Sequence, residues 1–565
     1  MRCFLMTIFA AVCMLGPAFA GPADDALDLA ESLRAKGDLQ GALKAATDGL
    51  NAVPGDYQLS LMAGDIYYDL GQYQDALYFY KRVLENKAKD PGALYGAGSS
   101  ALKLGLFQEA AGYFEKGINT KKKKAQFQYG LGMSLMELGN YAEADLNIRK
   151  AIDKDGKEPL YHIALGEVNY RNKVFSIAIS EFNKAIEMDS TMEKAYPDIH
   201  YKIAESYLQL RDLDNAIKEY RKNIELHPAD TTAWLKLAHI SQLSEKYTDA
   251  AFCFEKYLEI VPGDGERWFS LGELYVRLRD QDKAAQSFEK AITLKAREAE
   301  SYGHLANIYS DKKEYEKAWD SYTRYEKTFG PPDSVLYWFD KGKVALKLGA
   351  KDNAFFDSAL ASFQKVAGLD STYSSAYEYA GLSMYYKKDY ATAVPYFVKK
   401  IALDSTSVNS YRNLAFCYLK IESYDKAAGT FEKALALKPE DSQMRAMLGK
   451  IYTYNEKYDN AVKHFGIALN DYPDEATDSL RCVIYPDLGL SYLKLLRCTE
   501  AIPVLLKAEQ CSPREVSILF NIAAAYELCN KMKEANSYYK KVLAIDPGNK
   551  DAKKGEMRTR FQGQQ

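Results

Sequence analysis

Four cysteines lie close together near the end of the chain, and their chemistry depends on the compartment. They are Cys482, Cys498, Cys511 and Cys529. In an oxidising compartment such a cluster forms disulfides, and four cysteines allow three pairings. In a reducing compartment the same residues would be small buried hydrophobic side chains. The choice therefore depends on whether the chain is exported.

The N-terminal residues predict export. Arg2 is followed by an apolar run from Phe4 to Leu15, and the Ala-Phe-Ala that ends at Ala20 has the small-x-small pattern of a signal peptidase site. We expect residues 1–20 to be a cleaved signal peptide and the mature chain to begin at Gly21, in the periplasm or outside the cell. The apolar run is short for a membrane span, so an uncleaved N-terminal anchor is the less favoured alternative. Cleavage would leave no integral membrane span.

Residues for other kinds of chemistry lack the necessary spacing. None of the 6 histidines forms the His-x-x-x-His pair of a helical metal site. The Gly-x-Ser-x-Gly elbow and the phosphate-binding loop of nucleotide hydrolases are both absent. The 74 Lys and Arg against 77 Asp and Glu give a net charge of -3, which disfavours a nucleic-acid partner. We therefore expect a protein that is not an enzyme, with no catalytic residues, metal or cofactor.

A repeat of about 34 residues runs from Ala23 to Asn549. Its pattern is clearest in one stretch, at Trp268, Leu271, Gly272, Tyr275, Ala284 and Phe288. This spacing resembles the Trp-x2-Leu-Gly-x2-Tyr and Ala-x3-Phe pattern of the tetratricopeptide repeat (TPR) family. The resemblance extends over nearly the whole mature sequence and suggests an exported bacterial array of such repeats.

The resemblance implies an all-α fold, a right-handed α-solenoid superhelix of about fifteen helix-turn-helix repeats. The expected repeats start at Ala23, Tyr57, Pro91, Ala125, Pro159, Pro197, Thr231, Gly265, Ala299, Val335, Ser374, Val408, Ser442, Cys482 and Val516. Interruptions of the period predict boundaries between groups of repeats. The groups are residues 23–192 (repeats 1–5), 197–334 (repeats 6–9), 335–475 (repeats 10–13) and 482–549 (repeats 14–15), followed by a C-terminal cap or tail at 550–565.

Two positions of every repeat carry small side chains. The eighth is Gly or Ala and the twentieth is Ala, because the first helix (helix A) and the second helix (helix B) of a repeat must approach closely where they cross. Aromatic residues at the twenty-fourth position are expected to fill the wedge between the helices, so much of the high Tyr content is core. Cys253 and Cys417 fall at packing positions and are expected to be free and buried. Helix-B carboxylates such as Glu255 and Glu432 are expected on solvent faces.

In the TPR family helix A lines a concave groove, through positions 2, 5, 6, 9, 12 and 13 of each repeat. In this sequence aromatic and basic residues are richest at these positions in repeats 11–13. The predicted partner-binding residues are Tyr379, Tyr386, Arg412, Asn413, Phe416, Lys450 and Tyr454. Aromatic faces beside Arg and Asn suit an extended peptide or a sugar chain. The alternative is that some of these side chains pack between helices.

The absence of catalytic chemistry favours a non-enzymatic scaffold. We expect the groove to bind an extended segment of a partner protein or peptide, within an envelope complex. The expected role is in assembly, secretion or appendage biogenesis in the periplasm or cell envelope. The alternative is a TPR module that handles a glycan or exopolysaccharide in an export system.

The expected repeat geometry selects one cysteine pairing. Cys482 opens helix A of repeat 14 and Cys511 closes helix B of the same repeat, and antiparallel helices bring these ends together. Cys498 opens that helix B, and Cys529 closes helix A of repeat 15, which packs antiparallel against it. We predict the disulfides Cys482–Cys511 and Cys498–Cys529.

Overall fold

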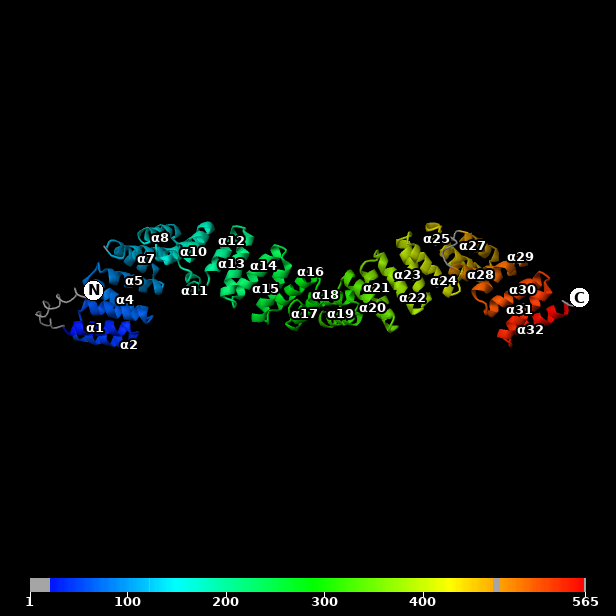
Figure 1. Cartoon of the computed structure of the whole chain (residues 1–565), viewed down its shortest axis with the longest axis horizontal. Helices are drawn as coiled ribbons and strands as arrows, with labels where there is room; N and C mark the ends of the chain where they lie inside the picture. The colour runs from blue at the N-terminus through cyan, green and yellow to red at the C-terminus, as the bar shows by residue number, and fades with distance from the viewer. Residues whose placement is uncertain (1–20, 121, 471–477, 563–565) are drawn as a thin grey trace, which may run out of the picture. The chain divides into compact units, whose positions relative to one another are not determined.

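A computed structural model describes residues 21–120, 122–470 and 478–562. The chain divides into two compact units, Met1–Ala284 and Ala285–Gln565. The predicted signal peptide and the predicted boundary after residue 475 both lie outside the described residues. Within each unit successive helices lie side by side in the order of the sequence (Figure 1).

The described residues of unit 1 form seven complete helix pairs. They are α1 (Pro22–Ala35) and α2 (Leu39–Ala52), α3 (Tyr57–Asp69) and α4 (Tyr73–Asn86), α5 (Pro91–Lys103) and α6 (Phe107–Ile118), α7 (Lys124–Glu137) and α8 (Tyr141–Lys154), α9 (Pro159–Arg171) and α10 (Phe175–Met188), α12 (Ile199–Gln209) and α13 (Leu213–Leu226), and α14 (Thr231–Leu243) and α15 (Tyr247–Ile260). The short α11 (Met192–Ala195) precedes α12, at the first predicted interruption of the period. Along the chain α16 (Gly265–Arg277) and α17 (Gln281–Thr293) come next, and the unit boundary falls within α17.

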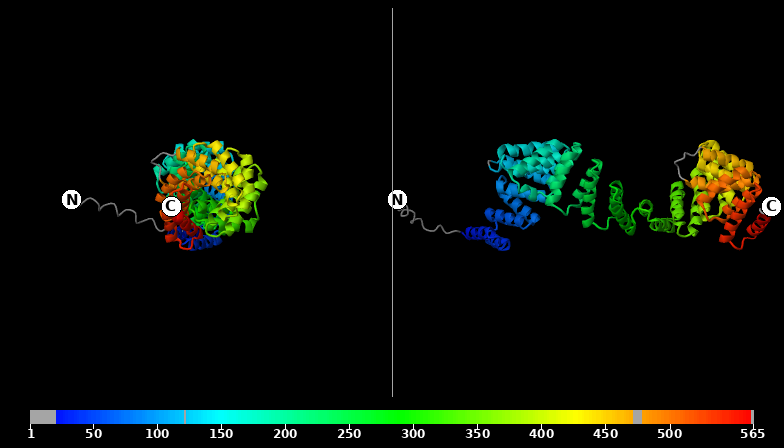
Figure 2. Two further views of the ribbon diagram at one scale, coloured as in Figure 1. Left: turned by 90° about the vertical axis from the view of Figure 1, so that its right-hand side faces the viewer. Right: turned by 45° about the vertical axis from the view of Figure 1, so that its right-hand side comes forward.

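Seven pairs are also found in the described part of unit 2. They are α18 (Glu298–Asp311) and α19 (Tyr315–Phe329), α20 (Val335–Leu348) and α21 (Ala354–Leu369), α22 (Ser374–Lys387) and α23 (Tyr390–Leu403), α24 (Val408–Lys420) and α25 (Tyr424–Leu437), α26 (Ser442–Tyr454) and α27 (Tyr458–Asn470), α28 (Asp478–Lys494) and α29 (Cys498–Cys511), and α30 (Val516–Leu528) and α31 (Met532–Ile545). The last helix, α32 (Lys550–Gln562), packs on α31 and α30. The helices run as hairpins in the further views of Figure 2. The all-α solenoid of helix pairs expected from the sequence is confirmed, with each helix A beginning within four residues of its predicted start.

Local sequence explains where the helices begin and turn. Asp90 caps α5 by accepting hydrogen bonds from the backbone N–H groups of Gly92 and Ala93, both at 2.9 Å, and Pro91 occupies the first helical position. Between helix A and helix B one residue adopts a left-handed conformation, such as Gly37 with φ of 81°. Lys173 does the same at φ of 61° although it carries a side chain. The conformation of this turn therefore depends on the packing of the two helices as well as on the turn sequence.

The small residues at positions 8 and 20 are buried between the helices, as predicted. The alanine at position 20 is fully buried in every repeat, as Ala144 and Ala427 illustrate. At position 8, a Cβ added to Gly166 would lie 2.6 Å from the ring of Phe182, and one added to Gly449 would lie 2.7 Å from Phe465. Both rings stand at position 24 of the same repeat. Because no real Cβ tolerates such distances, glycine is needed for the two helices to close on the ring.

Candidate binding surface

The residues that the sequence assigned to the groove share a face in unit 1. We call positions 2, 5, 6, 9, 12 and 13 of the repeats the helix-A face. A cavity of about 390 Å³ is lined by such residues of α1, α3 and α5, among them Arg34, Asp65 and Tyr95. A second cavity, of about 260 Å³, is lined by such residues of α7, α9 and α12, including Glu167 and Lys202. The helix-A face of unit 1 is therefore hollowed.

Charged groups on the helix-A face of unit 1 are paired with one another. The Arg34 guanidinium lies 2.7 Å from Asp69 and 3.3 Å from Asp65 on the next helix A. Glu167 binds both Arg171, at 2.8 Å, and Lys202 of the following repeat, at 2.6 Å. The same pattern joins Lys236 to Glu205 at 3.0 Å. These pairs link consecutive repeats, so this face is largely satisfied within the protein itself.

Tyrosines at position 24 connect this face to the core. The buried Tyr80 donates a hydrogen bond to Asp65 at 2.7 Å, and the buried Tyr220 donates one to Glu205. Burial and the neighbouring carboxylates both raise the pKa values of these two phenols. Sequence reasoning treated position 24 as apolar filling. The signal that could have revealed the hydrogen bond is Tyr rather than Phe at that position, with Asp or Glu fifteen residues earlier.

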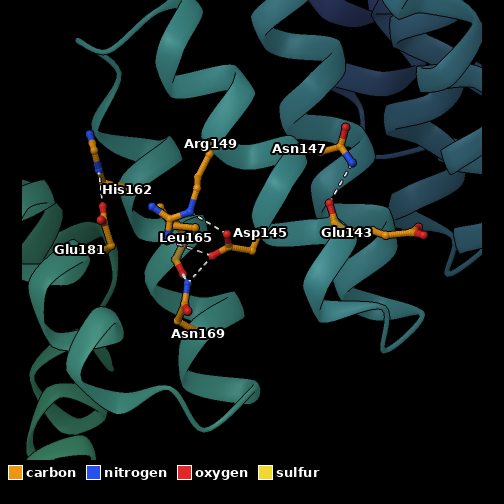
Figure 3. A network of polar contacts seen from close by, with 8 residues as sticks. All are labelled: Glu143, Asp145, Asn147, Arg149, His162, Leu165, Asn169 and Glu181. Atoms are coloured by element: carbon orange, nitrogen blue, oxygen red, sulfur yellow. Dashed lines mark hydrogen bonds and ion pairs between the residues drawn. The ribbon is translucent and has the colours of Figure 1, made fainter.

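A polar network crosses the boundary between repeats 4 and 5 (Figure 3). The buried Asn169 amide donates to Asp145 at 2.8 Å and to the Leu165 carbonyl at 2.9 Å. Arg149 completes the network through a 2.6 Å bond from its Nε to Asp145. In the same view the buried His162 points toward Glu181, with Nδ1 2.6 Å from the carboxylate. An equivalent pair, His200 and Glu219, lies in repeat 6 at 2.7 Å. These histidines hold helix A to helix B, and no cluster of metal-binding side chains is found among the described residues.

The helix-A face of unit 2 is aromatic where the sequence predicted a binding site. On α22, Tyr386 is 55% exposed, and its ring centroid lies 5.7 Å from that of Tyr385. Arg412, on α24, is exposed and forms no ion pair with any residue that the structure describes. Burial raises the pKa of Tyr385, and the positive charge of Arg412 acts in the opposite direction. An unpaired cation therefore lies within electrostatic range of the half-buried Tyr385, whose ring contacts the exposed Tyr386.

A second exposed group follows on α26. The Lys450 ammonium lies 5.9 Å from the centroid of the Tyr454 ring and 3.9 Å from the Asp487 carboxylate. Tyr454 is 50% exposed and stacks on Tyr424, with centroids 6.1 Å apart. Lys450 and Tyr454 therefore lie close enough together to contact the same ligand.

Other predicted site residues also serve in packing. Tyr379 lies 5.4 Å from the Phe339 ring and 5.5 Å from Phe363, in the core between repeats 10 and 11. Phe416 packs edge-to-face on Phe431 at 5.5 Å. Asn413 is half-buried on α24. Tyr379 and Phe416 consequently offer a partner only part of their surface.

Two helix-B carboxylates expected on solvent faces also have partners in the next repeat. Glu432 is exposed and Glu255 half-buried, and they accept hydrogen bonds from Tyr452 and Tyr275. Tyr309 donates the equivalent hydrogen bond to Glu289, at 2.8 Å. In each case the tyrosine occupies position 11 and the glutamate position 25 of the preceding repeat. The carboxylate serves as an inter-repeat acceptor because the phenol at position 11 reaches across the junction.

The structure places the clustered cysteines in the two pairs that the sequence predicts. Cys482 is joined to Cys511 and Cys498 to Cys529, each with a Cα–Cα distance of 5.6 Å. This distance lies within the range that a disulfide requires. Cys253 and Cys417 are free and buried. Among the described residues, no helix combines the length and the apolar character needed to cross a membrane.

Comparison with known proteins identifies the repeat. Models described as tetratricopeptide repeat match residues 27–93, 129–193, 197–230, 265–298, 299–325, 385–451 and 516–549, which is more than half of the chain. The chain belongs to the tetratricopeptide repeat family. The TPR resemblance seen in the sequence is thereby confirmed. The comparison with curated proteins found no match.

Several solved TPR structures are similar to parts or all of the chain. The Cut9–Hcn1 hetero-tetramer of the APC/C is 17% identical, with 96% of this chain and 97% of that chain covered and a TM-score of 0.30. A TPR protein from Parabacteroides merdae is 18% identical over 42% of this chain and 93% of its own, with a TM-score of 0.33. YrrB, described as a TPR protein with an unusual peptide-binding site, is 21% identical over 34% of this chain and 96% of its own, with a TM-score of 0.29.

Proposed function

We propose that this TPR protein is an exported, non-enzymatic scaffold that holds an extended segment of a partner protein on the helix-A face of repeats 11–13. The site comprises Tyr379, Tyr386, Arg412, Asn413, Phe416, Lys450 and Tyr454. It would act in the periplasm or cell envelope, where the signal peptide would deliver it. The TPR fold is consistent with protein–protein interaction and supports the proposal.

The observation that carries the proposal is the exposure of Tyr386 on α22 together with the unpaired Arg412 on α24, whose charge acts on the neighbouring Tyr385. Tyrosine and arginine are the residues that most often dominate binding energy when a partner covers them. A partner carboxylate could pair with Arg412 without breaking an ion pair within this protein. The exposed rings of Tyr386 and Tyr454 lie on α22 and α26, so a bound segment that reaches both must extend across repeats 11–13.

The binding test compares two double variants of the mature protein. Tyr386→Ala with Arg412→Ala removes one exposed ring and one unpaired cation from the proposed site. Tyr78→Ala with Lys89→Ala removes the same kinds of side chain from exposed positions in unit 1. On an array of envelope-protein peptides, we expect the first variant to bind at least about tenfold more weakly than wild type and the second to bind normally.

Two results would overturn the proposal. One is equal binding by both variants and the wild type. The other is binding to a glycan array but to no peptide, which would favour the polysaccharide-handling alternative. Export is tested separately by mass spectrometry of the protein from the periplasmic fraction, where we expect an N-terminus at Gly21. A chain that retains residues 1–20 would contradict cleavage.

A further inference from the structure

A cavity in unit 1 is lined by helix B as well as helix A and lies apart from the proposed peptide site. It has a volume of about 400 Å³ and lies among α13, α14 and α15. Its apolar lining includes Ile224, Trp234, Leu237, Phe252 and Cys253. Charged residues Arg221, Glu225 and Asp249 also line it.

The cavity lies where position 11 of a repeat, which is tyrosine in eight of the fifteen repeats, carries a small side chain. Position 11 of repeat 7 is Ser241, whereas repeats 8, 9 and 13 carry tyrosine there. Position 23 of repeat 7 is Cys253. Repeats 3 and 10 also have a small residue at position 11, Ala101 and Ala345, and in repeat 3 Tyr113 at position 23 supplies a ring. Repeat 7 therefore lacks the ring that position 11 supplies in eight of the repeats.

A buried hydroxyl in the lining has no partner. Ser241 is 1% exposed, and its Oγ forms no hydrogen bond with any residue that the structure describes. Ser134 and Ser206, also buried in helices, donate to the carbonyl four residues earlier, at 2.9 and 2.7 Å, whereas Ser100 and Ser301 share the state of Ser241 but do not line this cavity. An unpaired buried hydroxyl is unfavourable, so a ligand that brings a hydrogen-bonding group to Ser241 gains affinity.

The aromatic walls are partly fixed and partly accessible. Trp234 is anchored by a 2.9 Å hydrogen bond from its indole Nε1 to the Pro228 carbonyl. Phe252 packs edge-to-face on Trp234 at 6.1 Å and is 51% exposed, so it forms an accessible edge of the cavity. Burial raises the pKa of the Cys253 thiol to about 12, so this wall stays uncharged at neutral pH. The cavity thus presents apolar and aromatic surface with one unsatisfied hydroxyl.

We propose that this cavity binds a tyrosine side chain of a partner protein, which replaces the ring missing from repeat 7. A phenol combines a flat apolar ring with a single hydrogen-bonding group at its tip, which matches the walls and the Ser241 hydroxyl. In this arrangement the tyrosine enters with its phenol oxygen foremost. The partner backbone then lies near Arg221 and Asp249, which form a 3.0 Å ion pair. Tyr309, at position 11 of repeat 9, shows that such a junction accommodates a phenol.

The corresponding junction of repeats 8 and 9 provides an internal contrast. It also holds a cavity, of about 520 Å³, but Tyr309 already stands in its lining and donates to Glu289. Charged residues line both cavities, Lys317, Asp320 and Arg324 here and Arg221, Glu225 and Asp249 in the repeat 7 cavity, so the difference between the two is the tyrosine ring at position 11. We therefore expect a phenol to bind in the repeat 7 cavity and not in this one.

The test uses p-cresol, the side chain of tyrosine, and toluene, which lacks the hydroxyl. Binding to the mature protein is followed by NMR titration. We expect both compounds to bind the wild type, because apolar cavities take up small aromatic molecules. Ser241→Ala should weaken p-cresol about five- to tenfold and leave toluene unchanged, since only p-cresol uses the hydroxyl.

Two further variants separate the cavity from effects on folding. Ser241→Tyr should fill the cavity internally, abolish binding of both compounds and leave the thermal midpoint equal to or above that of wild type. Phe252→Ala removes a half-exposed wall and should weaken both compounds with little change in the midpoint. The proposal is overturned if p-cresol does not bind the wild type. It is also overturned if p-cresol binds Ser241→Ala as tightly as wild type, or if Phe252→Ala binds both compounds normally.

Discussion

The two units use the same face of helix A in different ways. In unit 1, Arg34, Arg171 and Lys202 each pair with carboxylates on their own or a neighbouring helix A. In unit 2, Arg412 pairs with no described residue, and Tyr386 exposes more than half of its surface. The helix-A face therefore holds repeats together through ion pairs in unit 1, whereas in unit 2 it also carries side chains, such as Arg412 and Tyr386, that stay open to solvent.

This difference separates positions that stabilise from positions that bind. A ligand that breaks an ion pair between repeats must replace it, so the net gain in affinity is small. A ligand that covers an exposed ring and neutralises an unpaired cation breaks no such pair. The fold alone therefore does not identify the binding face, because the partners of each side chain decide which part of the array is available.

The largest expected contrast in stability comes from the disulfides at the end of unit 2. Replacing Cys482 and Cys511 by Ser, and in a second variant Cys498 and Cys529, should each cost about 3 kcal/mol, because the bridges close loops of 29 and 31 residues in the unfolded chain. Hydrogen exchange should show lost protection in α28 to α32. Protection in α1 to α10 should stay unchanged, because each repeat packs mainly on its neighbours.

The oxidation state is the control for this comparison. Protein isolated from the periplasm should contain two free thiols, those of Cys253 and Cys417, when counted by mass spectrometry under denaturing conditions. Six free thiols, or variants as protected as the wild type in α28 to α32, would show that the cysteines act only as small buried side chains.

The next effect tests whether both units pack by the same rule. Ala427 in unit 2 and Ala144 in unit 1 are fully buried at position 20, where helix A crosses helix B. Leucine at either site should overpack the crossing and cost about 1–3 kcal/mol. Hydrogen exchange should show that Ala427→Leu loosens repeats 11–13 and Ala144→Leu loosens repeats 3–5. Uniform loss of protection along the chain from either substitution would contradict packing between neighbours alone.

The sequence predicted what depends on the repeat period. The starts of the helix pairs, the buried small positions and the cysteine pairs in the structure follow from spacing alone, because helix A and helix B of each repeat meet at fixed positions. The inter-repeat acceptor Glu255 was not predicted, since its role depends on a side chain of the next repeat, Tyr275.

The candidate site was harder to predict than the fold. Tyr379 and Tyr386 lie on the same helix and were both assigned to the helix-A face, yet Tyr379 packs on Phe339 and Phe363 whereas Tyr386 is exposed. Position numbers indicate a direction around the helix. They do not give the size of the neighbouring side chains, and this size decides how much of each ring stays exposed.

The smallest expected effect compares a well-paired carboxylate of unit 1 with a poorly paired one of unit 2. Burial acts to raise the pKa of Glu219, but hydrogen bonds with His200 and Lys222 outweigh it and lower the pKa. Burial raises the pKa of Asp487, and Lys450, 3.9 Å away, offsets this only in part. Ionised Glu219 therefore stabilises the folded state, whereas ionised Asp487 destabilises it.

Opposite pH dependence should follow for the matched amide variants. At pH 7, Glu219→Gln should lower the thermal midpoint and Asp487→Asn should raise it. The free energy of unfolding should change by less than about 1 kcal/mol in each case. The stabilisation by ionised Glu219 is full above its unfolded pKa of about 4.5 and declines as the pH falls through its lower folded pKa. The lower stability of Glu219→Gln relative to wild type should therefore persist down to about pH 4.5. The advantage of Asp487→Asn should shrink earlier, as the pH falls through the raised folded pKa of Asp487 toward its unfolded value of about 3.8. Thermal midpoints measured between pH 4 and pH 7 test this opposite pH dependence. If both variants shift the midpoint in the same direction at pH 7, the two carboxylates are paired alike.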